Sequence, residues 1–154
     1  MPGSWMHHEF PFLDADRHAV TSNATNQYNC TAWAAGDVLN NWWPDEMDIG
    51  FWPARAPREE TINAFIQAYE TLGYKLCADG LLQEGQEKIA IFGSGVEGSE
   101  TPTHVARQLA SGEWTSKLGP HEDISHKGVD DVRGPLYGKV ICFLSRPRPV
   151  AQNP

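Results

Sequence analysis

Positive charge is scarce in this chain. Twelve Lys and Arg residues stand against 20 Asp and Glu residues, which gives a formal net charge of −8 at pH 7 over 154 residues. An acidic surface repels phosphate groups, and basic side chains gather only in the short tail "SRPRP" (145–149). We therefore expect no nucleic-acid partner.

Long apolar runs are also missing, so the sequence predicts no membrane span and no membrane partner. Residues 1–13 lack the basic start and the apolar stretch of a secretory signal. This absence predicts a cytoplasmic location, with non-classical export as the alternative.

Cysteine is rare and odd in number: Cys30, Cys77 and Cys142. Three widely spaced cysteines do not form a disulfide framework, and they favour a reducing compartment; one bridge with one free thiol is the alternative. Cys77 beside Leu76 and Cys142 in "VICFL" are typical of core positions.

Motifs that bind metals are absent. The six histidines and the many acids include no paired-cysteine knuckle and no His-Glu-x-x-His pattern, and His121 and His126 lie among turn residues. The sequence therefore predicts no metal site and no cofactor.

The length suits a single domain spanning 1–154. Residues 1–27 are rich in Asn, Ser and Thr and have little periodicity, so we expect an irregular N-terminal segment there. Residues 147–154 are expected to form a flexible tail.

Hydrophobic periodicity changes along the chain from helical to strand-like. A helix is predicted from its N-cap Asn29 to Pro44, a loop over 44–57, and a second helix over 58–73. Alternating patterns then predict strands at 74–77, 88–92, 103–109, 113–117 and 137–144. The expected fold class is α+β: an antiparallel sheet of about five strands, with the N-terminal helix that carries the cysteine packed against it.

Cys30 is the candidate nucleophile because it lies in the first turn of that helix, where the partial positive charge favours a thiolate. A nearby imidazole would complete its activation. Among the histidines His104 is the best placed, because it follows Pro102 at the start of a strand in the sheet that the helix covers. His7, His8, His121 and His126 fall in irregular or polar segments.

Two motifs carry a resemblance to a known family. "YNCTAWA" (28–34) resembles the Asp-Cys-Ser-Gly-aromatic-Val signature of NlpC-type hydrolases, a branch of the papain-like cysteine peptidase superfamily. "EKIAIF" (87–92) and "HVARQLASGEWTS" (104–116) resemble the strand that precedes the family's catalytic histidine and the hairpin that contains it. The resemblance covers residues 28–36 and about 87–118, and it implies a papain-like fold.

The resemblance also implies catalytic roles. Cys30 and His104 would form the catalytic pair, and Ser116 stands where the family has the second histidine that orients the first. A serine holds a cationic imidazole poorly, so Asp123 or His126 from the following loop is an alternative third member. The 74 positions between Cys30 and His104 exceed the expected spacing, which makes the second helix an insertion.

A second group of residues is expected around the thiol. The backbone N–H of Cys30 would contribute to an oxyanion hole, with a further donor from Asn23, Asn26, Gln27 or Tyr28. Closing the hairpin at Ser111-Gly112 would pair Ala106 with Lys117 on the face of the histidine. The expected oxyanion or substrate-binding residues are Gln27, Tyr28, Asn29, Trp33 and Lys117.

The sequence thus predicts a thiol-dependent amide hydrolase that acts on a peptide, for example a cell-wall peptide, or on another amide-containing substrate. Acyl transfer or deamidation would use the same residues. The alternative is a non-enzymatic binding domain that uses the aromatic loop around Trp42, Trp43, Phe51 and Trp52. The oligomeric state is left open.

Overall fold

The described part of the protein is built around one antiparallel sheet. The structure is a computed structural model that describes residues 8–149. Within those residues seven strands pair in the order β1-β6-β5-β4-β3-β7-β2. Their bounds are β1 His18–Ser22, β2 Lys75–Cys77, β3 Gln86–Ser94, β4 Thr101–Gln108, β5 Trp114–Lys117, β6 Asp123–His126 and β7 Lys139–Pro147.

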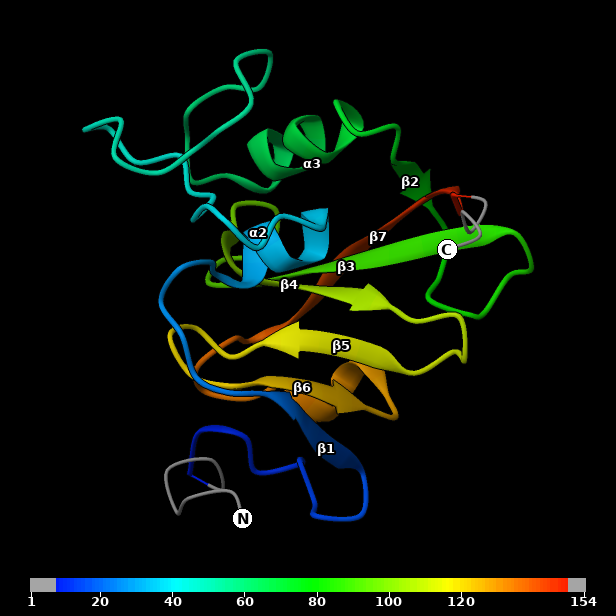
Figure 1. Ribbon diagram of the computed structural model, residues 1–154. Helices are drawn as coiled ribbons and strands as arrows, with labels where there is room; N and C mark the ends of the chain where they lie inside the picture. Colours follow the sequence, from blue (N-terminus) through cyan, green and yellow to red (C-terminus); the bar gives the residue numbers. More distant parts are fainter. Residues whose placement is uncertain (1–7, 150–154) are drawn as a thin grey trace.

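The predicted fold class is wrong. Residues 8–149 form mostly a seven-stranded sheet, with two short α-helices, α2 (Cys30–Ala35) and α3 (Ile62–Glu70), and the 3-10 helix η1 (Val129–Val132). This is not an α+β papain-like domain with a helix packed on a sheet of about five strands. Figure 1 shows α2 and α3 together on one side of the sheet.

Two strands were missed, and both lie at one edge of the sheet. β1 falls in the segment 1–27 that was predicted to be irregular, and β6 falls in the polar stretch that was predicted to be loop. β1 is mostly exposed and β6 has four residues, so neither has a strand-like alternation of polar and apolar residues. They form because each pairs along its backbone with a neighbour, His18 with His126 and Ser116 with Ile124. The predicted tail 147–154 lies mostly outside the described residues.

The sheet is covered on both faces. In β3, Ile89 and Ile91 point to the face that α2 and α3 cover, together with Val105 of β4. The alternate residues Ala90 and Phe92 point to the opposite face, which is covered by apolar residues from outside the sheet: Phe10, Leu13, Val132 and Tyr137. This two-sided burial explains why β3 reads as a continuous apolar run.

Helix α2 is much shorter than predicted. Asn29 caps its start, accepting a hydrogen bond from the Ala32 N–H at 3.0 Å. The helix ends at Gly36, which adopts φ +84° and donates its N–H to the Ala32 and Trp33 carbonyls. Glycine reaches this left-handed conformation without a steric penalty and so stops the helix eight residues before Pro44.

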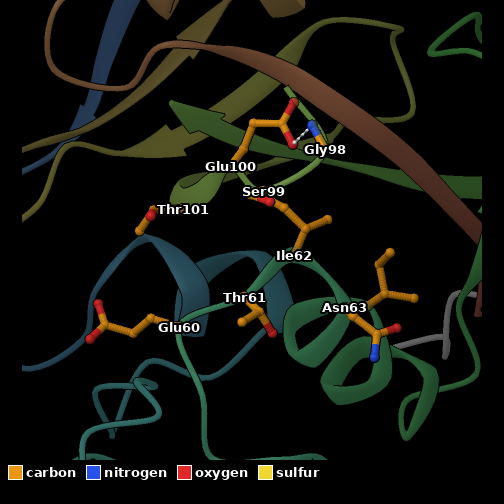
Figure 2. Close-up of a pocket in the computed structure, with 9 residues that line it drawn as sticks. Glu60, Thr61, Ile62, Asn63, Gly98, Ser99, Glu100 and Thr101 are labelled. Carbon is orange, nitrogen blue, oxygen red and sulfur yellow. Dashed lines mark hydrogen bonds between the residues drawn. The ribbon is translucent and has the colours of Figure 1, made fainter. Parts of the chain in front are cut away.

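Helix α3 also begins later than predicted, at a cap formed by Thr61, whose hydroxyl accepts from the Ala64 N–H at 3.1 Å. Its apolar face is buried, and the Tyr69 hydroxyl donates to the Thr31 carbonyl of α2 at 2.6 Å. Figure 2 shows a pocket between the start of α3 and residues 98–101, which contains none of the predicted site residues. In residues 8–149 no helix has the length and apolar character needed to cross a bilayer.

The pairing of β4 with β5 is brief and has a register that differs by one residue from the prediction. Its two pairs are Arg107 with Thr115 and Gln108 with Trp114. Ala106 therefore lies opposite Ser116, and the predicted pairing of Ala106 with Lys117 is wrong. Because a shift of one residue moves a side chain to the other face, Ser116 shares the face of His104 and Lys117 does not.

Candidate functional site

Three polar side chains form a row across neighbouring strands on the face opposite the helices. His104 comes from β4, Ser116 from β5 and His126 from β6, and all three are fully buried. The Ser116 hydroxyl lies 2.9 Å from Nε2 of His104 and 2.8 Å from Nε2 of His126. Nδ1 of His126 lies 2.8 Å from the Gly128 carbonyl.

The Gly128 carbonyl fixes the proton positions along this row. A carbonyl only accepts, so Nδ1 of His126 must donate, and Nε2 of a neutral His126 must then accept from the Ser116 hydroxyl. Ser116 in turn accepts from Nε2–H of His104. Nδ1 of His104 is therefore unprotonated, and its lone pair has no hydrogen-bond partner within residues 8–149.

Burial keeps both imidazoles neutral. Removal from water lowers the pKa of His104 well below its ordinary value, and the neighbouring His126 lowers it further. Burial likewise lowers the pKa of His126, partly opposed by its bond to Gly128 and by Asp131. Tyr137 stacks on His104 with ring centroids 4.0 Å apart, and Phe92 meets the imidazole edge-on at 5.3 Å.

Cys30 is the first residue of α2 and its side chain is buried, with 6% of the residue exposed. Burial raises the pKa of the thiol; the backbone N–H of Val105 and the hydroxyl of Thr31 are the main groups that oppose this shift. Burial therefore opposes the thiolate that was expected at the helix start. At neutral pH the pair consists of a thiol and a neutral imidazole.

The thiol lies where β4 and β5 have separated. The Leu109 N–H donates to the Glu113 carbonyl, so the N–H groups of alternate residues, Val105 included, point toward β5. The ladder ends at Arg107, and the Val105 N–H instead acts on the sulfur. Since N–H groups of a strand lie in the plane of the sheet, the sulfur occupies the opening between the two strands.

His104 and Cys30 approach this opening from opposite sides. The imidazole packs with Phe92 on one face, whereas α2 lies on the other face, against Val105. Within residues 8–149 no hydrogen bond joins Sγ of Cys30 to the imidazole; the thiol contacts Oγ1 of Thr31 at 3.8 Å. The structure thus brings the two residues to the same gap without a direct bond.

Lys117 and Tyr28 lie on the helix side of the gap. Nζ of Lys117 donates to three carbonyls, those of Thr25 at 2.8 Å, Gly119 at 2.7 Å and His121. Burial lowers the pKa of Lys117, while Asp123 and Cys30 act in the opposite direction. The cation lies 5.4 Å from the ring of Tyr28, and a thiolate at Cys30 would raise the pKa of Lys117 by charge attraction.

Tyr28 is held by a buried carboxylate. Its hydroxyl donates to Oδ2 of Asp123 at 2.6 Å, and its ring stacks on Trp33 at 5.5 Å. The indole N–H of Trp33 donates to Oγ1 of Thr115 at 3.0 Å, and Arg107 lies over the indole. Asp123, which the sequence left open as a third catalytic member, therefore contacts Tyr28 and not His104.

The other predicted site residues have different places. Gln27 is exposed. The side chain of Asn29 caps α2 and bonds both the N–H and the carbonyl of Trp42, so it anchors the loop that follows the helix. In that loop Trp42 and Trp52 are buried and Phe51 is 48% exposed, so the two tryptophans serve the core.

The sequence reasoning underrated one site residue and missed another. His126 was an open alternative, and its place depended on recognising β6. Tyr137 lies between Gly134 and Gly138, which bond to each other through both backbones. Two glycines around a short loop were the available signal that its side chain is held in a fixed position.

Residues 8–149 contain no group of three or more His, Cys, Asp or Glu side chains arranged to hold a metal ion.

Comparison with known proteins places the chain in a family. A family model with the description "Domain of unknown function (DUF7689)" matches residues 19–145. The chain belongs to this family. The match spans both the cysteine-bearing helix and the row of polar side chains. No curated protein and no solved structure matches the chain.

Proposed function

We propose that this protein is a thiol-dependent amide hydrolase that acts on a peptide. The observation that carries the proposal is the row His104–Ser116–His126, which ends on the Gly128 carbonyl and leaves Nδ1 of His104 as a buried base with no hydrogen-bond partner within residues 8–149. An unpaired buried acceptor is costly, and its cost supports a role for this nitrogen as a base.

The proposed reaction starts from neutral groups. The sulfur of Cys30 attacks the amide carbonyl while Nδ1 of His104 takes the thiol proton, and the C–N bond breaks as that proton passes to the leaving amine. Water then attacks the thioester while the same nitrogen takes its proton, the C–S bond breaks to release the acid and the thiolate, and the proton returns to the sulfur. Ser116 accepts from Nε2–H throughout and holds the ring in one tautomer.

The buried position of the sulfur sets a condition on this chemistry. With 6% of Cys30 exposed, a substrate carbonyl reaches the sulfur only when the opening between β4 and β5 widens. Nearby positive charge from Lys117 supports the thiolate that is released at deacylation. Acyl transfer or deamidation would follow the same first step, with a different nucleophile or leaving group.

A peptide chloromethyl ketone tests the proposal. It should alkylate Cys30 in preference to Cys77 and Cys142, which serve as internal controls in the same protein, and His104→Ala should abolish the preference. Peptide mapping by mass spectrometry identifies the modified residue. Equal modification of the three thiols, or modification of Cys30 that ignores His104, would refute the hydrolase.

We also propose a cytoplasmic location. The three cysteines are free in the structure, although Cys77 and Cys142 lie on paired strands, and free thiols persist in a reducing compartment. A thiol titration of protein purified under non-reducing conditions tests this: three free thiols support it, and an oxidised pair contradicts it.

A further inference from the structure

A cavity of about 530 Å³ opens beside the candidate catalytic residues. Its walls are mostly apolar and come from three segments: Glu9 and Phe10, residues 118–121, and Leu136 with Tyr137. The volume falls within the range of pockets that bind small ligands or a peptide side chain. Glu9 contributes the acidic group of the lining.

Tyr137 connects this cavity to the catalytic pair. Its ring forms part of the cavity wall and stacks on His104 with planes 7° apart. Its hydroxyl is close enough to Cys30 for the charge of the thiolate to raise the pKa of the phenol, in addition to the larger effect of burial. A group in the cavity therefore contacts the tyrosine that stacks on His104.

The walls are held in place by backbone contacts. Nζ of Lys117 bonds the carbonyls of Gly119 and His121, which fixes the loop 118–121. Across the cavity, Gly134 and Gly138 bond each other with N–O distances of 3.1 and 2.8 Å, which closes the loop that carries Leu136 and Tyr137. A pocket with restrained walls selects by size and polarity at little ordering cost.

We propose that this cavity binds a large apolar side chain, the size of leucine or phenylalanine, in the peptide whose amide bond Cys30 attacks. The inference rests on the proposed function and adds the substrate class to it. Moving an apolar side chain from water into this mostly apolar cavity lowers its free energy. An acidic side chain would instead be repelled by Glu9 and by the net negative charge of the protein.

Two measurements test the cavity separately from the chemistry. Hydrolysis of acetyl-peptide aminocoumarins that differ in one residue, Leu, Phe, Ser or Asp, measures the preference in kcat/KM; we expect at least a tenfold preference for Leu or Phe over Ser. Binding of acetyl-leucinamide and acetyl-serinamide to the Cys30→Ala protein, followed by NMR, measures recognition without turnover.

Leu136→Glu places a carboxylate in the cavity at a residue that is 46% exposed, so folding should tolerate it. It should remove the Leu preference and the binding of acetyl-leucinamide. Leu81→Glu, at a leucine that is 71% exposed and outside the cavity, is the matched control and should change neither.

The outcomes separate the two proposals. Hydrolysis without an apolar preference in the unmodified protein overturns the cavity assignment and leaves the hydrolase standing. Binding of acetyl-leucinamide that Leu136→Glu removes, without any hydrolysis, supports the cavity and overturns the hydrolase. Binding that is equal for both amides, or insensitive to Leu136→Glu, overturns the cavity assignment.

Discussion

The ring of Tyr137 lies flat against the imidazole of His104, with centroids 4.0 Å apart and planes 7° apart. This contact covers one side of the imidazole and excludes water from it. It also places the position of His104 under the control of the loop 134–138, because Tyr137 is held there between two glycines that bond to each other.

Gly138→Ala should therefore disturb both stability and the site. A Cβ at position 138 would lie 2.2 Å from the Gly93 carbonyl, and φ is +72°. Gly85→Ala has nearly the same φ, +77°, with nothing within 4 Å, and isolates the conformational cost of about 1–2 kcal/mol. We expect Gly138→Ala to lower the free energy of unfolding in urea by clearly more than Gly85→Ala; equal losses would contradict the close approach.

His126→Phe should release the tautomer of His104. Without an acceptor at position 126 the Ser116 hydroxyl loses the bond that orients it, at a cost of about 1–3 kcal/mol, and it can then donate to Nε2 of His104. Kcat/KM should fall about 10²-fold or more. His126→Gln keeps a carbonyl oxygen near Ser116 and should retain part of the activity. The ¹⁵N shifts of His104 report the tautomer. An unchanged tautomer in His126→Phe would refute the control of His104 by the row His104–Ser116–His126.

Stability should fall as the solution is acidified below about pH 6.5. The pKa values of His104 and His126 are lowered in the folded state, so between those values and the unfolded value the unfolded chain binds more protons. The free energy of unfolding should then decrease by about 1.4 kcal/mol per pH unit for each histidine. His126→Phe should roughly halve the slope. Urea titrations from pH 5 to 8 measure it, and a flat profile between pH 5 and 6.5 would rule out neutral buried histidines.

Small electrophiles should modify Cys30 slowly at neutral pH. Burial raises the pKa of Cys30, and it raises that of Cys142 to about 11, so both sulfurs are protonated at pH 7. Alkylation of Cys30 by iodoacetamide should accelerate above about pH 8.5, the ordinary thiol range. Labelling of the unfolded chain provides the reference rate for each cysteine. Rapid modification of Cys30 near pH 6 would instead indicate a thiolate paired with an imidazolium.

The sequence predicted those strands whose side chains alternate or form an apolar run. β3, β4 and β7 carry such patterns and lie near the predicted ranges. β1 and β6 do not, because their pairing depends on backbone contacts between segments about 100 residues apart. The missing pair of strands made the fold class wrong.

The site was predictable in part for a similar reason. Cys30 and His104 were indicated by the start of a helix and the start of a strand, and Ser116 by its distance from the hairpin. The contact of Ser116 with His126 follows from the register of β5 with β6, which a four-residue polar strand does not reveal. The burial of Cys30 depends on long-range packing and had no local signal.

The brief ladder between β4 and β5 has a mechanical consequence. Within residues 8–149 two residue pairs of the ladder and the bond from the Leu109 N–H to the Glu113 carbonyl join the three strands β1-β6-β5 to the four strands β4-β3-β7-β2. Hinge motion along this line would break few backbone hydrogen bonds, but it would also separate Ser116 from His104 and move α2, which packs on both strands. Cys30 sits on the hinge line, and amide exchange at Arg107 and Thr115 would report how often the two sets of strands part.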